Sequence, residues 1–395
     1  MKRAGLTRRE FTCAMGAGAA AVLAGCASNT SSNDAAASDA VAENATEEAS
    51  QEETDRAQDE PAPGAATEAA ASAPLTCFDM HADTVTRIAM QKYPPYDQEL
   101  DRYTGDLECN NGELSADRMG AVRWAQCYAI WMPDEDEKIS HVDWYHKSVK
   151  WFKKQMKMHA DRFAQARSGS DIQKILEDGK VAAILTVENA ACLDAGLEMV
   201  DEFAKDGVRI ASLTWNGKNV LGCGNDNVDE GLTDLGRECI AALEERDIIV
   251  DVSHLNDKCF WEVDKLATKP YVATHSNARA VCNHSRNLDD DQFKAIVASG
   301  GLVGLNFNMD FVRNGGTLYT FEELAAHVEH WLSLDGGEDA LALGSDRDGA
   351  ITPSWLADCG MQSYLYARFE EAFGQSIADK LFYKNALRLF GVEEG

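Results

Sequence analysis

The sequence predicts an α/β protein whose folded part is a (β/α)8 barrel of the TIM type. Two observations carry this prediction. From residue 75 onward, short apolar runs alternate with amphipathic segments, which is the pattern of βα units and a parallel sheet. There are eight such runs over about 320 residues, and a barrel of this type takes about 250 residues plus insertions. A doubly wound open sheet is the alternative, although no Gly-x-Gly-x-x-Gly loop follows the first run.

Each expected strand is a short apolar run bounded by polar or turn-forming residues. In chain order these runs are Leu75–Met80, Val122–Ile130, Val181–Val187, Val208–Leu213, Ile248–Val252, Tyr271–Ala273, Leu302–Leu305 and Leu341–Leu343. The segments between and after them show helical spacing of apolar residues. The expected helices include His141–Arg167, Leu197–Lys205, Leu232–Glu245, Asp289–Ala298, Phe321–Leu334 and Ser376–Leu389.

The composition is that of a folded, strongly acidic protein. Hydrophobic residues make up 45% and charged residues 26% of the 395 residues, which is ordinary for a soluble globular chain. The 37 Lys and Arg against 66 Asp and Glu give a formal net charge of −29. Such a surface repels phosphate backbones, so we expect no nucleic-acid partner. It also raises the local concentration of cations, which is consistent with a metalloenzyme.

Residues 1–26 have the features of an export and lipidation signal. The pair Arg8–Arg9 lies in a Thr-Arg-Arg-Glu-Phe stretch that resembles the twin-arginine export signal. The weakly apolar run Cys13–Gly25 that follows is shorter than the roughly 20 residues that span a bilayer. It ends in Leu-Ala-Gly-Cys, which looks like a lipobox with Cys26 as the lipidated residue. We therefore expect an extracytoplasmic protein attached to the cell membrane by a lipid; a basic N-terminus with a chance cysteine is the alternative.

The segment 27–74 is expected to be an acidic linker. It consists mainly of Ala, Ser, Glu, Asp and Thr and contains no aromatic residue, so burial cannot offset the entropy cost of ordering it. This gives three parts: the signal at 1–26, the linker at 27–74 and the barrel domain at 75–395. Nine of the eleven cysteines lie in the barrel domain without any Cys-x-x-Cys pair, so we expect core residues rather than a disulfide framework.

Histidine and carboxylate side chains follow five of the eight predicted strands. In chain order they are His81, Asp83, Glu188, His254, His275 and Asp346. Barrel enzymes carry their active sites at the C-terminal ends of the strands, so we expect all six to point into one mouth. Three imidazoles and three carboxylates suit divalent cations such as zinc. The other histidines of helical stretches are expected on solvated faces; they are His141, His146, His159, His327 and His330.

Around these residues the chain resembles the membrane dipeptidase, or renal dipeptidase, family of zinc hydrolases. The resemblance runs from about Leu75 to Phe390. Its most specific part is residues 274–288, Thr-His-Ser-Asn-Ala-Arg-Ala-Val-Cys-Asn-His-Ser-Arg-Asn-Leu. This stretch is similar to the family signature Ser-His-Ser-Ser-Ala-Arg-Ala-(Val/Leu)-Cys-x-His-Pro-Arg-Asn. Residues 231–237 and 385–390 support the match, and the resemblance implies a barrel of the metal-dependent hydrolase kind.

The resemblance implies a site with two divalent metal ions, zinc in preference. Glu188 would bridge them, with His81 and Asp83 completing the first site and His254 and His275 the second. One bridging carboxylate can hold two cations about 3.5–4 Å apart around a water. Asp346 would accept the proton of that water and pass it to the leaving amine.

Arg286 would bind the free carboxylate of the substrate through a two-point contact. The nearby Asp348 is instead expected to cap the turn before Gly349.

Two residues depart from the family pattern. Where the better-known branch has a substrate-binding histidine after the fourth strand, this chain has Trp215, which can donate one hydrogen bond but cannot accept or titrate. Trp215 is therefore a candidate substrate contact of altered specificity. Between Asp346 and Asp348 lies Arg347, in place of the usual aromatic or aliphatic residue. Its charge would either lower the pKa of Asp346 or point to solvent.

Taken together, these features predict an exported, lipid-anchored, binuclear zinc dipeptidase that hydrolyses small dipeptides through a metal-bridged water. The lipid would be its only attachment to the membrane, and a homodimer is compatible with the sequence. A related barrel hydrolase of another small amide, such as a cyclic imide or an N-acyl amino acid, is one alternative. A non-catalytic solute-binding lipoprotein is the other, but it has no need for six convergent ligands.

Overall fold

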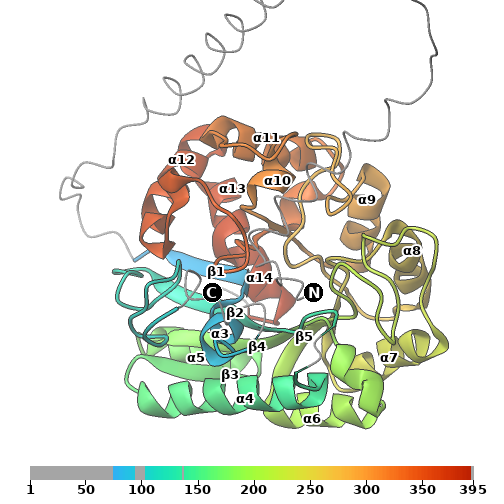
Figure 1. Cartoon of the computed structure of the whole chain (residues 1–395). Helices are drawn as coiled ribbons and strands as arrows, with labels where there is room; N and C mark the ends of the chain where they lie inside the picture. The colour runs from blue at the N-terminus through green and yellow to red at the C-terminus, as the bar shows by residue number, and fades with distance from the viewer. Residues whose placement is uncertain (1–73, 94–102, 136–137, 393–395) are drawn as a thin grey trace, which may run out of the picture.

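The computed structural model describes residues 74–93, 103–135 and 138–392 (Figure 1). The predicted signal, with Arg8–Arg9 and Cys26, and the predicted linker up to residue 73 lie outside the described residues. Among the described residues, no helix is long and apolar enough to cross a membrane.

Parallel strands form the centre of the molecule. They are β1 (Thr76–Ala82), β2 (Arg123–Trp131), β3 (Phe163–Ala166), β4 (Val181–Glu188), β5 (Val208–Ser212), β6 (Ile249–Asp251), β7 (Val303–Leu305) and β8 (Leu341–Leu343). Seven of them neighbour one another in the order β6-β5-β4-β2-β1-β8-β7. The run at 271–273 lies between β6 and β7, because Val272 makes a parallel bridge with Asp251 and Ala273 with Val303. These bridges complete a ring of eight, so the predicted barrel is confirmed and the open doubly wound sheet is wrong.

Helices surround this ring, and in Figure 1 those between residues 198 and 373 follow one another around the strands, from green through yellow and orange to red. They are α3 (Thr84–Ala89), α4 (His141–Met158), α5 (Gly169–Glu177), α6 (Glu198–Asp206), α7 (Asp234–Glu245), α8 (Asp257–Leu266), α9 (Asp290–Ser299), α10 (Met309–Val312), α11 (Phe321–Leu332), α12 (Gln362–Phe373), α13 (Gln375–Asp379) and α14 (Asn385–Leu389). A π-helical stretch, η6 (Lys380–Lys384), joins the last two. The Asn385 side chain binds the carbonyl of Leu341 at the start of β8, so α14 lies at the N-terminal end of the barrel, away from the strand ends that carry function.

Capping side chains fix where several helices begin. The Thr233 hydroxyl accepts from the backbone N–H of Gly236 at the start of α7. Asp289 and Gln292 form a reciprocal capping box at the start of α9. Each cap satisfies backbone N–H groups that the first turn of a helix leaves without an internal partner. The predicted first residues of these two helices lie within two residues of the observed ones.

The predicted helix over His141–Arg167 is wrong in its last part. Helix α4 ends at Met158, and Phe163–Ala166 forms strand β3 against the first half of β4. Ala and Gln in this stretch favour helix locally. Pairing with the adjacent strand β4 satisfies the same backbone groups and overrides that preference.

Large aromatic side chains and cysteines contribute to the buried core. Trp124, Trp131 and Trp144 are at most 1% exposed. All nine cysteines of the described residues are free thiols, and every one except Cys109 is buried. The cysteines of the barrel therefore act as small core residues, as expected from the sequence.

Candidate metal centre

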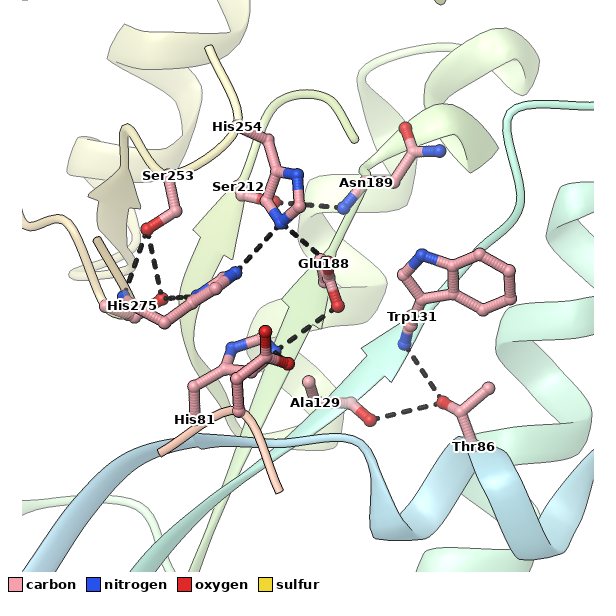
Figure 2. A network of polar contacts seen from close by, with 12 residues as sticks. His81, Thr86, Ala129, Trp131, Glu188, Asn189, Ser212, Ser253, His254 and His275 are labelled. Carbon is pink, nitrogen blue, oxygen red and sulfur yellow. Dashed lines mark hydrogen bonds and ion pairs between the residues drawn. The ribbon is translucent and has the colours of Figure 1, made fainter. Parts of the chain in front are cut away.

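Four predicted ligands meet at the C-terminal ends of the strands. His81 lies on β1, Glu188 ends β4, His254 follows β6 and His275 follows the 271–273 run. Figure 2 shows Glu188 beside the three imidazoles, with contacts to His81 and His254. Its Oε2 lies 3.3 Å from Nε2 of His81, and its Oε1 lies 2.9 Å from Nε2 of His254. The Nε2 atoms of His254 and His275 are 2.8 Å apart.

Two more predicted residues, Asp83 and Asp346, converge on His81. Ligand atoms of His81, Asp83 and Asp346 all lie within 4.8 Å of one another, as do those of His81, Glu188 and His275. The Oδ1 atom of Asp346 is 4.0 Å from Nε2 of His81. The structure therefore brings together all six side chains that the sequence places in one mouth.

These six side chains are removed from water, since none is more than 5% exposed. Three carboxylates concentrated in a buried site need a compensating positive charge, because ionised groups lose their hydration there. Burial by itself disfavours a charged imidazole, but the hydrogen bond and charge of Glu188, with the charges of Asp83 and Asp346, raise the pKa of His81 to about 9. The electrostatics of the site therefore favour a cation.

Hydrogen bonds behind the ligands set the tautomers of two histidines. The Thr274 hydroxyl lies 2.5 Å from Oδ2 of Asp251 and 2.7 Å from Nδ1 of His275. Because a carboxylate can only accept, the hydroxyl donates to Asp251 and accepts from the Nδ1–H of His275. The Nδ1 of His254 likewise lies 2.7 Å from Oδ1 of Asn216 and donates to it. Both Nε2 atoms thus carry lone pairs.

This donor set fits divalent metal ions. Nε2 of His254 lies 2.8 Å from Nε2 of His275 and 2.9 Å from Oε1 of Glu188, so a divalent cation would satisfy all three acceptors at once. Imidazole nitrogen with carboxylate oxygen is the ligand combination of zinc and related ions. Hydrogen bonds that orient ligating histidines are also typical of metal sites.

The loop after β8 brings Asp346 to the site in a strained conformation. Asp346 has φ +58°, which is left-handed and costs free energy in any residue with a Cβ. Its backbone N–H donates to the carbonyl of His81 at 3.1 Å, and Asn306 donates to its Oδ2 at 3.2 Å. A Cβ on Gly349 would lie 1.9 Å from Oδ2 of Asp83 and 2.4 Å from Oδ1 of Asp346. Glycine is thus required there for both carboxylates to keep their places.

Arg286, the predicted substrate-binding residue, lies beside His275. Its guanidinium donates to the carbonyl of His275 at 3.3 Å and to the Ser276 hydroxyl at 3.4 Å, and it lies over the ring of Phe311. The side chain is 4% exposed. A charged group this well buried is held in one orientation, which suits recognition of a planar carboxylate.

His327 holds the segment that carries Arg286. Its Nδ1 accepts from the N–H of Ala278 and its Nε2 donates to the carbonyl of Val312. The ring is fully buried, and burial lowers its pKa to about 4. The expected solvated position of His327 is therefore wrong, and its two backbone partners explain why a neutral ring is stable there.

The two departures from the family pattern have different outcomes. Trp215 is half-buried next to the ligands, with its ring edge-on to Trp131 at 5.2 Å and 6.3 Å from the His254 ring. Arg347 turns away from the mouth: it is fully buried, donates to the Leu356 carbonyl at 3.0 Å and lies over the Phe307 ring. The solvent-facing alternative for Arg347 is therefore wrong, because the loop turns this side chain into the core.

The residues that orient the ligands were not predicted from the sequence. Asp251 accepts hydrogen bonds from the backbone N–H groups of Ser253 and Thr274 and from the Thr274 hydroxyl, so it supports His254 and His275 together. The sequence feature that could have revealed Asp251 is a carboxylate inside an apolar run, because a charge buried there needs hydrogen-bond partners. Asn216 carried no such signal, because its partner His254 is 38 residues away.

Three comparisons with known proteins show which proteins this chain is similar to. A family model described as membrane dipeptidase (peptidase family M19) matches residues 68–394. An uncharacterized protein from the pqqA 5′ region of Klebsiella pneumoniae is 36% identical over 247 residues, which are 60% of this chain and 91% of that protein.

Two solved structures are similar over most of the barrel. One is the dipeptidase AC, described as a metallopeptidase of family M19, with 28% identity and a TM-score of 0.70 over 80% of this chain and 98% of that one. The other is a metallopeptidase from Rhodobacter sphaeroides bound to a phosphinate mimic of the dipeptide L-Ala-D-Ala, with 27% identity and a TM-score of 0.69 over 80% and 99%. The chain therefore belongs to the membrane dipeptidase family, peptidase family M19, and is a metal-dependent dipeptidase, a hydrolase.

Proposed function

We propose that this dipeptidase hydrolyses small dipeptides that carry a free C-terminal carboxylate, with two divalent cations, zinc in preference, held on either side of Glu188. The observation that carries the proposal is the orientation of the Glu188 carboxylate. One of its oxygens faces His81 and the other faces His254. A carboxylate with its two oxygens directed at two sets of ligands is arranged to bridge two cations.

Each cation would have its own ligands besides Glu188. His81 and Asp83, whose ligand atoms converge, would hold the first. His254 and His275, whose Nε2 atoms are 2.8 Å apart, would hold the second. When bound, divalent cations supply Lewis acidity, which lowers the pKa of water and polarises a carbonyl oxygen.

Asp346 would move the proton between the water and the leaving amine. Its Oδ1 lies on the His81 side of the site, while Oδ2 accepts from Asn306. One oxygen is thus held by Asn306, and the other lies near the proposed metal ligand His81. A carboxylate in this arrangement takes a proton from the attacking water and returns it to the amine nitrogen as the peptide bond breaks.

The substrate class follows from Arg286 and from a relative. The buried guanidinium beside His275 offers a planar two-point contact to the free carboxylate of a dipeptide. The Rhodobacter sphaeroides enzyme binds a dipeptide mimic, which supports a small dipeptide as the substrate here. The half-buried indole of Trp215 gives an apolar wall near His254, so it would contribute to the choice among dipeptides.

A dipeptide should be cleaved faster than its C-terminal amide if Arg286 binds the carboxylate. A charge-assisted pair contributes about 1.5–3 kcal/mol, or roughly 10–150-fold in kcat/KM. The substitution Arg286→Lys should lose part of this preference, because an ammonium cannot reproduce the two-point contact. The measurement is kcat/KM for matched acid and amide substrates, including L-Ala-D-Ala. The control Arg279→Lys alters an arginine of the same segment that pairs with Asp257 and should keep the preference. Equal turnover of acid and amide by the parent enzyme would contradict the carboxylate-binding function proposed for Arg286.

We also propose that the enzyme is exported and anchored by lipid at Cys26, on the basis of Arg8–Arg9 and the Leu-Ala-Gly-Cys sequence. Native protein should partition with membranes and carry lipid, whereas Cys26→Ser should abolish lipidation. A chain that starts at Leu75 should be soluble with unchanged kcat, because the linker separates anchor and barrel. Recovery of Cys26→Ser in the membrane fraction with the same lipid would contradict the anchor.

A further inference from the structure

The loop that carries Asp346 is strained at two positions. Asp346 has φ +58° and Asp348 has φ +65°, so two residues with a Cβ adopt the left-handed conformation within three positions. Such conformations persist only where the surrounding contacts determine them. The contacts that hold Asp348 therefore bear on where Asp346 lies.

The Asp348 carboxylate accepts three hydrogen bonds, which come from two separate segments. The Thr84 hydroxyl donates to its Oδ2. The Tyr103 hydroxyl at 2.9 Å and the backbone N–H of Glu113 at 2.6 Å donate to its Oδ1. The side chain is 5% exposed. It therefore links the loop to the start of α3 and to the 103–113 segment, instead of capping the following turn as expected from the sequence.

One of these segments leads directly to a proposed metal ligand. Thr84 follows Asp83, and the backbone N–H of Asp83 donates to the Arg347 carbonyl at 2.9 Å. Gly349 fits against the carboxylates of Asp83 and Asp346. The Asp348 carboxylate thus fixes the loop and α3 relative to each other at the point where Asp83 and Asp346 meet.

The Glu113 carboxylate and Arg347 support the same junction. The Thr352 hydroxyl donates to Glu113 Oε1 at 3.1 Å, and the Asp348 N–H lies 3.4 Å from its Oε2. Burial and the charge of Asp348 raise the pKa of Glu113 to about 7, while the positive charge of Arg347 opposes this. Asp348 itself belongs to neither set of converging ligand atoms. Its contacts act on the loop and not on the reacting atoms.

We propose that Asp348 is a positioning residue for this dipeptidase: by binding Thr84, Tyr103 and the Glu113 backbone, its carboxylate holds Asp346 in line with Asp83 and His81. The inference rests on the function proposed for Asp346. It predicts that loosening Asp348 slows the chemical step without emptying the metal site or weakening substrate binding.

The test is kinetics with metal analysis on Asp348→Asn, Tyr103→Phe and the double variant. Because misplacement of a catalytic group by about 1 Å can cost 10²-fold, Asp348→Asn should lower kcat roughly 10–100-fold, with KM and metal content unchanged. Tyr103→Phe removes one bond of the same carboxylate and should lower kcat by a smaller factor. The double variant should be little worse than Asp348→Asn alone, because residues of one network are non-additive.

Glu244→Gln is the matched control. Glu244 is a buried carboxylate that accepts from the backbone N–H groups of Thr268 and Lys269 and from the Thr268 hydroxyl. These partners precede the strand run at 271–273, so Glu244 lies at the opposite end of the barrel from the metal site. It should lower the melting temperature while kcat stays normal. The proposal would be overturned if Asp348→Asn had the same kcat as this control. It would also be overturned if the decrease in kcat of Asp348→Asn were matched by an equal decrease in bound metal.

Should Asp348→Asn not fold, an unchanged kcat for Tyr103→Phe would overturn the proposal, and a lowered kcat at full metal content would support it. The parent enzyme and Asp346→Asn are assayed alongside. They distinguish failure of the proposal for Asp348 from failure of the proposed function. Turnover by the parent that is lost in Asp346→Asn upholds the proposed function whatever Asp348 does.

Discussion

Asp346→Asn should lower kcat by roughly 10²–10⁴-fold, the usual contribution of a general acid–base group, while metal content stays that of the parent. An amide cannot take a proton from water at neutral pH, yet it keeps the size of the side chain and an oxygen that can accept from Asn306. The left-handed backbone at Asp346 also suits asparagine. The variant therefore removes the proton transfer with little change to the loop.

The measurement is kcat on a dipeptide together with metal per chain for Asp346→Asn. A matched control is Asp379→Asn, which changes another buried aspartate that accepts from Tyr366 and Lys384. That control should retain kcat. Near-normal kcat of Asp346→Asn with full metal occupancy would remove Asp346 from the mechanism.

Glu188→Gln should lower the metal content of both sites together and abolish most activity. The neutral amide that replaces the carboxylate offers one oxygen and one NH2 group, so it cannot bridge two cations. The lost charge is buried, at 1% exposure, between His81 and His254. Metal content should fall from about two per chain in the parent to well below that, with activity falling in parallel.

Metal analysis after dialysis, with dipeptide turnover at several zinc concentrations, checks this prediction. Glu244→Gln again serves as the control for loss of a buried carboxylate far from the site. Retention of full metal content by Glu188→Gln would contradict the bridging function. Selective loss of one metal would place Glu188 in a single site.

The strands were predictable because a parallel barrel buries both faces of each strand, so the strands appear as continuous apolar runs. Even Tyr271–Ala273, which pairs through single bridges, was visible in this way. Strand β3 was not, because Phe163–Ala166 carries no apolar run and joins the sheet only through pairing with β4. Local sequence does not encode that partner.

The candidate site was predictable in its members but not in their surroundings. His81, Glu188 and His275 could be grouped because strand ends converge in a barrel. The inward turn of Arg347 depends on the Phe307 ring and the Leu356 carbonyl, and the burial of His327 depends on Ala278 and Val312. These partners come together only in the folded chain. From the residue type alone, a charged or polar side chain is predicted to lie at the surface.

The most direct test of the account is turnover of a dipeptide panel by the barrel domain before chelation, after chelation and after zinc is restored, with metal per chain measured at each step. We expect about two divalent metals per active chain, loss of turnover with loss of metal, and recovery when zinc returns. Full dipeptide turnover by metal-free protein would contradict it.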